Sequence, residues 1–223
     1  MKLLAVDTAT ESCTAALLVD GDVRERYEFA PRGHGGLVLP MVDSLLAEAG
    51  LSVTDLDGLV LGRGPGSFTG VRIGAAVVQG IAFAADLPVA PVSTLAAMAQ
   101  GAVRMREGRS VLVAIDARMQ EVYWGCYQLG AEALVEPLCA EAALAPEAVT
   151  APGTGPWLAV GSGWACYAPQ LAAAVRTPPI EIIRDFYPHG QDLAVLGARL
   201  IREGRWITPD QALPVYLRDR VAN

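Results

Sequence analysis

The chain has 223 residues, of which 52% are hydrophobic and 18% charged, enough for one large or two small packed domains. A formal net charge of −7 argues against direct gripping of nucleic acid, because phosphate contacts need a clustered basic surface. The four cysteines are widely spaced without a CxxC pair, which argues against a zinc ribbon or a disulfide framework. No uninterrupted apolar run has membrane-spanning length. We therefore expect a cytoplasmic protein with no membrane segment.

The first half of the chain predicts three strands followed by alternating helices and strands, in the order βββαβαβα. Asp20 and Gly21 are typical of a tight hairpin turn between the second and third strands. Gly50 is a suitable residue for a helix C-terminus, and Ser93 is a suitable cap for a third helix. We expect strands at 3–6, 13–19, 23–29, 59–61 and 89–92, and helices at 37–49 and 71–85.

A second unit begins at Val111 and repeats the pattern of the first. "VLVAID", "ARMQ" and "EVYWGCYQ" echo "LLAVD", "TATES" and "CTAALLV", so that strand, aspartate, turn and strand occur twice. Two such halves describe an α/β protein of the actin-like (ASKHA) fold with two ββαβαβα-type lobes. Prolines at 146–156 and 177–179 predict that the second lobe is reduced. We expect lobes at 1–106 and 107–223; two unrelated hairpins remain the alternative.

The stretch "GRGPGSFTGVRIG", which begins at Gly62, has the glycines of an anion-binding loop at the start of a helix. It lacks the Gly-Lys-Ser/Thr ending of a Walker loop and is not the GxGxxG of dinucleotide folds. We expect the loop to position the helix that follows rather than to perform chemistry, with Ser67 or Thr69 as the helix cap. The loop residues are Gly64, Pro65, Gly66, Ser67 and Thr69.

Two aspartates are candidates for nucleotide binding. Asp7 and Asp116 each end an apolar strand, and the GSG at Gly161–Gly163 resembles the adenosine-side loop of actin-like folds. The alternative is that both carboxylates accept hydrogen bonds from the backbone of their own turns. With these residues we predict a vestigial nucleotide cleft.

The helix after the loop, "GVRIGAAVVQGIAFAAD", is apolar nearly all round and is therefore expected to be buried nearly all round. One stripe, Ile73, Val77, Gly80 and Ala84, would cover the sheet; the opposite stripe, Arg72, Ala76, Gln79 and Phe83, would meet a partner helix. Burial within a larger single core is the alternative. The predicted interface comprises Leu37, Val38, Met41, Val42, Leu45, Phe68, Arg72, Ala75, Ala76, Gln79 and Phe83.

Five segments together resemble the TsaB (YeaZ) family over most of the chain: "LLAVDTATESCTAALL", "GPGSFTGVRIG", "PVSTLAAMA", "DARMQEVYW" and "PVYLR". The resemblance implies an actin-like pseudoenzyme that binds and activates a TsaD-type transferase. That transferase installs the threonylcarbamoyl group on adenosine at position 37 of tRNA. The expected partners are the TsaD-type subunit, a TsaE-type ATPase and, for the chain alone, a second copy through the same helices. Contact with tRNA is expected only through the complex.

The resemblance also indicates what the chain lacks. TsaD-type proteins carry a His-x-x-x-His metal pair after a Pro-Val strand, where this chain has Thr94 and Met98. Because His34 and His189 are far apart in sequence, we expect each to be a surface or hydrogen-bonded structural residue, with no metal and no cofactor. The family has His-Ser at the start of its first helix, whereas this chain has His34-Gly35. This puts any role of that serine hydroxyl in doubt.

Two other function classes are compatible with the sequence. An actin-like small-molecule kinase or ATPase would use Asp7 and Asp116. A self-contained homodimeric scaffold unrelated to tRNA would use the same apolar helices.

Overall fold

A computed structural model describes residues 1–218, and the contacts within the chain divide it into two compact units. The first unit consists of Met1–Ala97 and Pro188–Val215, and the second of Met98–Tyr187 and residues 216–218. These limits differ from the predicted division after residue 106. The third helix runs from the first unit into the second, and a late segment of the chain returns to the first unit, which no local pattern in the sequence indicates.

Within residues 1–218 the first unit has one five-stranded sheet with the strand order β3-β2-β1-β4-β5. β2 is antiparallel to its neighbours β1 and β3, whereas β4 and β5 run parallel to β1. Asp20 and Gly21 both have positive φ, at 50° and 105°, so the predicted hairpin turn is confirmed. The strands are β1 (Lys2–Asp7), β2 (Ser12–Val19), β3 (Asp22–Phe29), β4 (Gly58–Gly62) and β5 (Val89–Val92).

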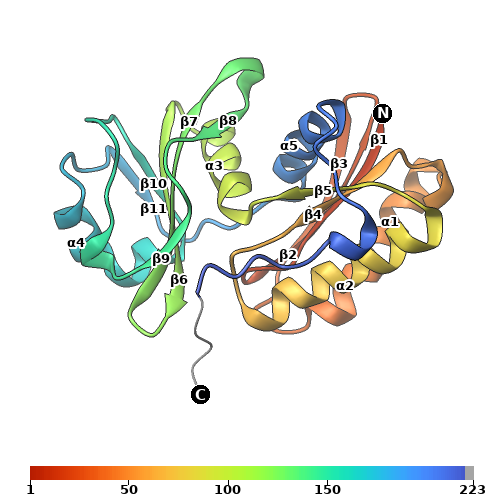
Figure 1. Ribbon diagram of the computed structural model, residues 1–223, viewed down its shortest axis with the longest axis horizontal. Coiled ribbons are helices and arrows are strands. Elements are labelled where there is room, and N and C mark those ends of the chain that lie inside the picture. The colour runs from red at the N-terminus through yellow and green to blue at the C-terminus, as the bar shows by residue number, and fades with distance from the viewer. Residues whose placement is uncertain (219–223) are drawn as a thin grey trace. The chain divides into compact units, whose positions relative to one another are not determined.

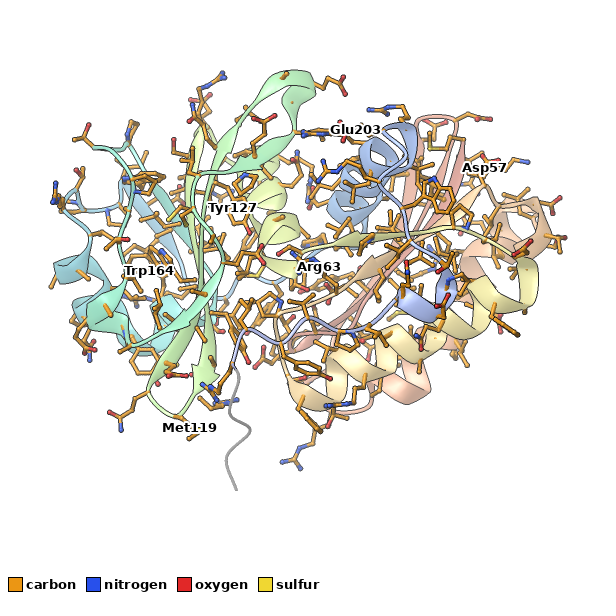
Figure 2. The ribbon with its side chains drawn as sticks, in the orientation of Figure 1. Asp57, Arg63, Met119, Tyr127, Trp164 and Glu203 are labelled. Atoms are coloured by element: carbon orange, nitrogen blue, oxygen red, sulfur yellow. The ribbon has the colours of Figure 1, made fainter. Side chains whose placement is uncertain are left out.

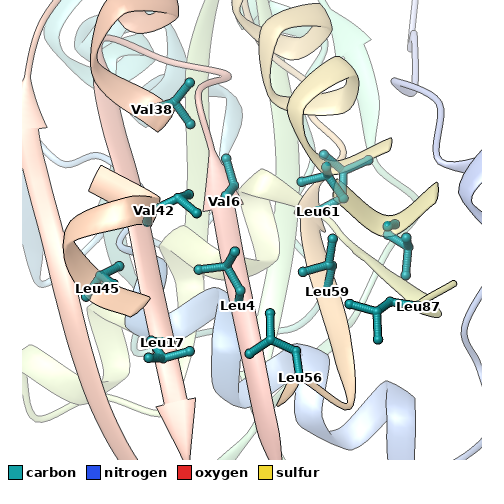
Figure 3. Packing of buried hydrophobic residues seen from close by; sticks show 14 of the residues in the cluster. Leu4, Val6, Leu17, Val38, Val42, Leu45, Leu56, Leu59, Leu61 and Leu87 are labelled. Atoms are coloured by element: carbon teal, nitrogen blue, oxygen red, sulfur yellow. The ribbon is translucent and has the colours of Figure 1, made fainter. Parts of the chain in front are cut away.

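Helices cover both faces of this sheet (Figure 1). α1 (His34–Ala49) and α2 (Phe68–Ala85) lie side by side on one face, and α5 (Gly190–Arg202) lies on the other. Because strand side chains alternate, every second residue points at α1 and α2; Figure 3 shows Leu4, Val6, Leu59 and Leu61 packed there. The short 3-10 helices η1 (Val53–Asp55) and η4 (Pro209–Gln211) complete this unit.

The helix ends follow the predicted chemistry, but two helices start earlier than expected. α1 begins at His34 rather than at residue 37, because two glycines in its first turn carry no apolar signal. It ends at Gly50, whose φ of 64° is the left-handed conformation expected of a C-terminal glycine. α2 begins at Phe68 rather than at residue 71. α3 (Thr94–Met105) is capped by Ser93, whose hydroxyl accepts hydrogen bonds from the next turn.

The second unit repeats the strand order of the first. In the described part of the chain its sheet has the order β11-β10-β6-β7-β8, with β9 also paired to β7. β6 and β7 form an antiparallel hairpin and β10 runs parallel to β6, as β1, β2 and β4 do in the first unit. The strands are β6 (Ser110–Arg118), β7 (Glu121–Leu129), β8 (Val135–Pro137), β9 (Ala142–Leu144), β10 (Leu158–Val160) and β11 (Glu181–Ile183).

This equivalence confirms the actin-like α/β fold and the internal repeat. The second unit is reduced. α4 (Ser162–Ala174) follows β10 as α2 follows β4, but between β6 and β10 only the 3-10 helices η2 (Ala131–Ala133) and η3 (Pro146–Ala148) occur, where the first unit has α1 between β1 and β4. α5 follows β11 as α3 follows β5, yet α5 packs on the first sheet. Gly197 permits this packing, because a Cβ there would lie 2.3 Å from Val60 Cγ2.

Candidate docking surface and glycine-rich loop

The glycine-rich loop is pressed against the turn between β1 and β2. β1 and β4 are parallel neighbours, so the loop after β4 and the turn after β1 leave the sheet at the same edge. A Cβ on Gly62 would lie 2.1 Å from Asp7 Oδ2, and one on Gly66 would lie 2.1 Å from the Ala9 carbonyl oxygen. A Cβ on Gly70 would lie 2.1 Å from the Thr8 carbonyl oxygen. These glycines are required by close backbone packing.

Hydrogen bonds fix the loop in this position. The Ser67 N–H donates to the Ala9 carbonyl at 2.7 Å, and the Thr8 hydroxyl donates to the Gly70 carbonyl at 2.7 Å. The Ser67 hydroxyl accepts from the Gly70 N–H at 3.1 Å, so Ser67 rather than Thr69 is the cap of α2. The Ser67 N–H, which a phosphate cradle would direct at its ligand, is used within the protein.

Asp7 is fully buried, and both of its carboxylate oxygens accept hydrogen bonds. Oδ1 accepts from the Ala9 N–H and Oδ2 from the Thr94 hydroxyl, each at 2.7 Å. Burial raises the pKa of Asp7 to about 6, against the lowering effects of these hydrogen bonds and of His34. The sequence identified Thr94 only as the residue in place of a metal-binding histidine; its role is to hold Asp7.

The carboxylate of the second aspartate, Asp116, also accepts hydrogen bonds within its own turn. Asp116 Oδ1 accepts from the Arg118 N–H at 2.9 Å, and Oδ2 accepts from the Arg118 guanidinium at 3.0 Å. Gly161 and Gly163 face Ala114 of β6, where Cβ atoms would lie 2.4 Å and 2.8 Å from its nearest atoms. The backbone hydrogen bonds expected of both aspartates are therefore present. Asp7 lies in the first unit and Asp116 in the second. The nucleotide cleft stays a prediction.

The two histidines have different surroundings. His189 Nδ1 lies 3.1 Å from Glu25 Oε2, and its ring stacks on Tyr27 with 4.5 Å between centroids, as expected for a structural residue. His34 is buried, and within the described part of the chain its Nε2 has no hydrogen-bond partner, which differs from the expectation. No group of three or more His, Cys, Asp or Glu side chains in residues 1–218 is placed to hold a metal ion.

α2 has one buried and one exposed face, so the prediction of burial nearly all round is wrong. The buried residues are Gly70, Val71, Gly74, Ala75, Val78 and Ala82, of which Ala75, Val78 and Ala82 join the core cluster. The predicted inward stripe is incorrect, since Gly80 and Ala84 are exposed. The predicted outward stripe is on the surface: Arg72, Ala76 and Phe83 are exposed and Gln79 is half-buried.

Four residues assigned to the interface lie in the core of the first unit instead. Val38, Val42, Leu45 and Ala75 are at most 4% exposed and pack under the two helices, where they cannot contact a partner directly. The heptad-like apolar pattern of α1 marks its inward face. Leu37 and Met41 are half-buried at its margin. Leu39 is 48% exposed and was missed, because it lies off that apolar stripe.

The outer face of α2, defined here as Phe68, Thr69, Arg72, Ala76, Gly80, Phe83 and Ala84, is apolar for a solvent-facing surface. Phe83 is 82% exposed and Phe68 is 56% exposed. The Arg72 guanidinium carbon lies 3.2 Å from the centroid of the Phe68 ring, a cation–π contact. Among residues 1–218, α2 alone is long and apolar enough to cross a membrane by length and composition, but its buried face packs on β4 and β1. The outer face has the composition of a protein-docking surface.

Comparisons with known proteins agree with this architecture. The family model described as tRNA N6-adenosine threonylcarbamoyltransferase matches residues 28–223. The tRNA threonylcarbamoyladenosine biosynthesis protein TsaB of Escherichia coli is 43% identical, and the alignment covers 100% of this chain and 96% of that protein. This chain belongs to the TsaB family. The TsaB of Haemophilus influenzae is 44% identical, and the alignment covers 99% of this chain and 95% of that protein.

The fold of the TsaB family is also found in solved structures. The structure of YeaZ from Pseudomonas aeruginosa has a TM-score of 0.92 and 45% sequence identity, and the match covers 97% of this chain and 99% of that one. The sequence resemblance to the TsaB (YeaZ) family and the predicted fold class are thus confirmed.

Proposed function

We propose that this chain is a non-catalytic subunit that binds and activates a TsaD-type transferase, which installs the threonylcarbamoyl group on adenosine at position 37 of tRNA. The names of the full-length relatives support a role in tRNA threonylcarbamoyladenosine biosynthesis. The match of the transferase family model to most of the chain supports a common ancestry with the catalytic subunit.

The observation that carries the proposal is the outer face of α2. Phe83 and Phe68 project from a helix whose other face is anchored in the core, and small residues at Ala76 and Gly80 let a second helix approach closely. Exposed aromatic side chains beside small residues favour a helix-packing partner over solvent. The TsaD-type subunit is the proposed occupant, and a second copy of this chain occupies the same face when the subunit is absent.

The remaining parts of the proposal follow from the family. A TsaE-type ATPase is the third protein of the complex. tRNA contacts the chain only through the complex, in keeping with its net charge of −7. No cofactor is required, and the complex acts in the cytoplasm.

The geometry around Asp7 supports a non-catalytic role. An actin-like kinase or ATPase would need this carboxylate for magnesium or water, but its two oxygens already accept from Ala9 and Thr94. The Ser67 N–H of the neighbouring loop is similarly occupied. Turnover of ATP by the purified chain with magnesium separates the two functions, since a kinase-class site would exceed background without any partner.

An Ala76→Arg substitution tests the proposed interface. Ala76 is exposed, so the free monomer should fold normally, with a change in the free energy of unfolding within about 0.5 kcal/mol. A partner helix would bury the new charge unpaired, which should weaken association by about a hundredfold or more. Ala173→Arg on α4, an equally exposed helical alanine in the second unit, is the matched control.

Binding is measured by pull-down with the TsaD-type subunit and by light scattering for the homodimer, with circular dichroism as the folding check. Normal binding of Ala76→Arg would place the interface elsewhere. If deletion of the gene leaves threonylcarbamoyladenosine in bulk tRNA unchanged, the homodimeric scaffold is the better explanation.

A further inference from the structure

An irregularity in the second sheet brings two cysteines together. β8 and β9 pair with the same edge of β7: Tyr127 is opposite Pro137, and Trp124 is opposite Ala142. Between these pairs β7 has the two residues Gly125 and Cys126, whereas the opposing segment has four, 138–141. The two extra residues form a bulge over Cys126, and the Leu138 N–H donates to the Cys126 carbonyl at 2.8 Å. Cys139 is the next residue of this bulge.

Both thiols lie on the core face of the sheet. Cys126 is fully buried in the cluster that contains Trp124 and Trp164, and Cys139 is half-buried against the same cluster. Tyr127, labelled in Figure 2, belongs to the opposite face, and its hydroxyl donates to Glu141 at the end of the bulge. The bulge is therefore held at both ends, while Cys139 keeps access to solvent.

The two thiols are neighbours in this cluster. The Cys126 thiol donates to the Thr150 carbonyl at 3.5 Å. The adjacent Cys126 lowers the pKa of Cys139 to about 7, against the opposing effects of burial and of Glu141, and the adjacent Cys139, together with burial, raises the pKa of Cys126. The Cys139 thiol is therefore more readily ionised than the Cys126 thiol and than an ordinary cysteine.

From this geometry we infer that Cys126 and Cys139 form an oxidisable dithiol site, in which Cys139 is the thiol attacked by a peroxide and Cys126 is the thiol that resolves it as an intrachain disulfide. This property is independent of the proposed interface, which lies on α2 in the first unit. The disulfide would link β7 to the bulge after β8, and a thiol reductant would reduce it again.

The reaction balances with a peroxide as the oxidant. The Cys139 thiolate attacks one peroxide oxygen, the O–O bond breaks, and the leaving hydroxide takes a proton to become water. The resulting sulfenic acid is attacked by the Cys126 sulfur, the S–O bond breaks, and a second water leaves with the Cys126 proton. Two thiols are oxidised to one disulfide, and one peroxide is reduced to two waters.

The other two cysteines lack these features. Cys13 is fully buried in the first unit, where burial, Asp7 and Glu28 raise its thiol pKa to about 11. Cys166 is exposed on α4. They serve as internal controls for a buried thiol and an exposed thiol.

The test oxidises the full chain with hydrogen peroxide at pH 7, blocks the remaining thiols with N-ethylmaleimide and digests with Glu-C protease. Cleavage after glutamates, which is blocked before Pro137, separates Cys126 in peptide 122–132 from Cys139 in peptide 133–141. We expect these two peptides to be joined, with Cys13 and Cys166 alkylated. Cys166→Ser should give the same linkage. In Cys126→Ser, Cys139 should stop at a sulfenic acid that dimedone traps.

A second readout is the pH at which iodoacetamide alkylates Cys139. The midpoint should lie below that of an ordinary cysteine in the native chain and should rise in Cys126→Ala, which removes the neighbouring thiol. The inference is overturned if Cys126 remains reduced while Cys139 is oxidised further to a sulfinic acid. It is also overturned if Cys126 and Cys139 pair with Cys166 or Cys13 as often as with each other while circular dichroism shows a folded chain.

Discussion

At the scale of single residues, the glycines of the loop after β4 have a steric role. Gly62, Gly66 and Gly70 each face an atom of residues 7–9 at a distance that no Cβ could tolerate. Because these glycines have no side chain, the start of α2 can pack closely on the β1–β2 turn. Gly80 of the same helix is different, since a Cβ there would meet nothing within 4 Å.

Gly70 and Gly80 of α2 give a matched test. Gly70→Ala should destabilise the protein by about 2 kcal/mol or more, because the new methyl would displace the Thr8 carbonyl. Gly80→Ala should stabilise it by up to about 1 kcal/mol through better helix propensity. Urea unfolding of both variants at one low protein concentration measures the difference. Equal effects would contradict the proposed packing.

Ionisation of Asp7 is costly to the fold, because the carboxyl group is fully buried. Its pKa is about 6 in the folded protein and about 3.8 in the unfolded chain, so the folded state binds the proton more tightly between these values. Stability from Asp7 is therefore fully present below pH 3.8 and is lost as pH rises to about 6. The shift corresponds to about 3 kcal/mol.

Asp7→Asn removes this titration while keeping the size of the side chain. The amide oxygen can accept from Ala9 N–H, and the Thr94 hydroxyl can turn to accept from the amide nitrogen. The free energy of unfolding of the variant, relative to the native protein, should rise by about 2.4 kcal/mol between pH 4 and pH 7. Chemical unfolding at several pH values measures this difference, and a flat difference would show that Asp7 does not titrate there.

At the scale of secondary-structure elements, the two faces of α2 have different roles. Its first turn is fixed by Ser67 and by the docking of Gly70 on Thr8, and its inner face supplies Val78 and Ala82 to the core. Its outer face stays apolar and exposed. A helix held this firmly can present Phe83 without being reorganised on binding, which reduces the entropic cost of association.

The start of α2 can be tested with two hydroxyl residues. Ser67→Ala should lower the free energy of unfolding by about 1 kcal/mol, because the Gly70 N–H loses its cap. Thr69→Ala, an exposed change inside the helix, should have an effect within about 0.5 kcal/mol. Thermal and urea unfolding of both variants provide the measurement. A larger loss for Thr69→Ala would assign the cap to Thr69.

At the scale of the whole molecule, the first unit is completed by a segment from the end of the chain. α5 covers the sheet face opposite α1 and α2, and the Val89 backbone pairs with Ile207 at the sheet edge. The buried residues of this face include Leu3, Ala5 and Val60. Residues 1–97 alone would leave this apolar face in water.

Removal of the segment should therefore unfold the first unit. A chain ending at residue 187 is expected to lose protection from proteolysis throughout residues 1–97, mapped by mass spectrometry of the fragments. Gly197→Val in the full chain should act in the same direction, because its Cβ would lie 2.3 Å from Val60 Cγ2. Full protection of residues 1–97 in the shortened chain would mean that α5 is dispensable.

Local chemistry made much of the fold predictable. The turn at Asp20-Gly21, the helix end at Gly50 and the cap at Ser93 depend on one or two residues each, and all three are present. The surface position of the outward stripe of α2 was also predicted correctly, because Arg72 and Gln79 give it polar side chains; its contact with a partner stays a prediction. The inward stripe was wrong, since no polar residue distinguishes the other sides of an apolar helix.

The sequence by itself determined the repeated strand–aspartate–turn–strand pattern, the actin-like fold and membership of the TsaB family, because these are carried by local periodicity and by contiguous motifs. Tertiary structure alone decided which apolar side chains of α1 and α2 are core and which are surface, that α5 completes the first unit, and that Asp7 is held by Thr94. It also brought Cys126 and Cys139 together through a bulge. Each of these depends on packing between segments distant in the chain, which no local pattern records.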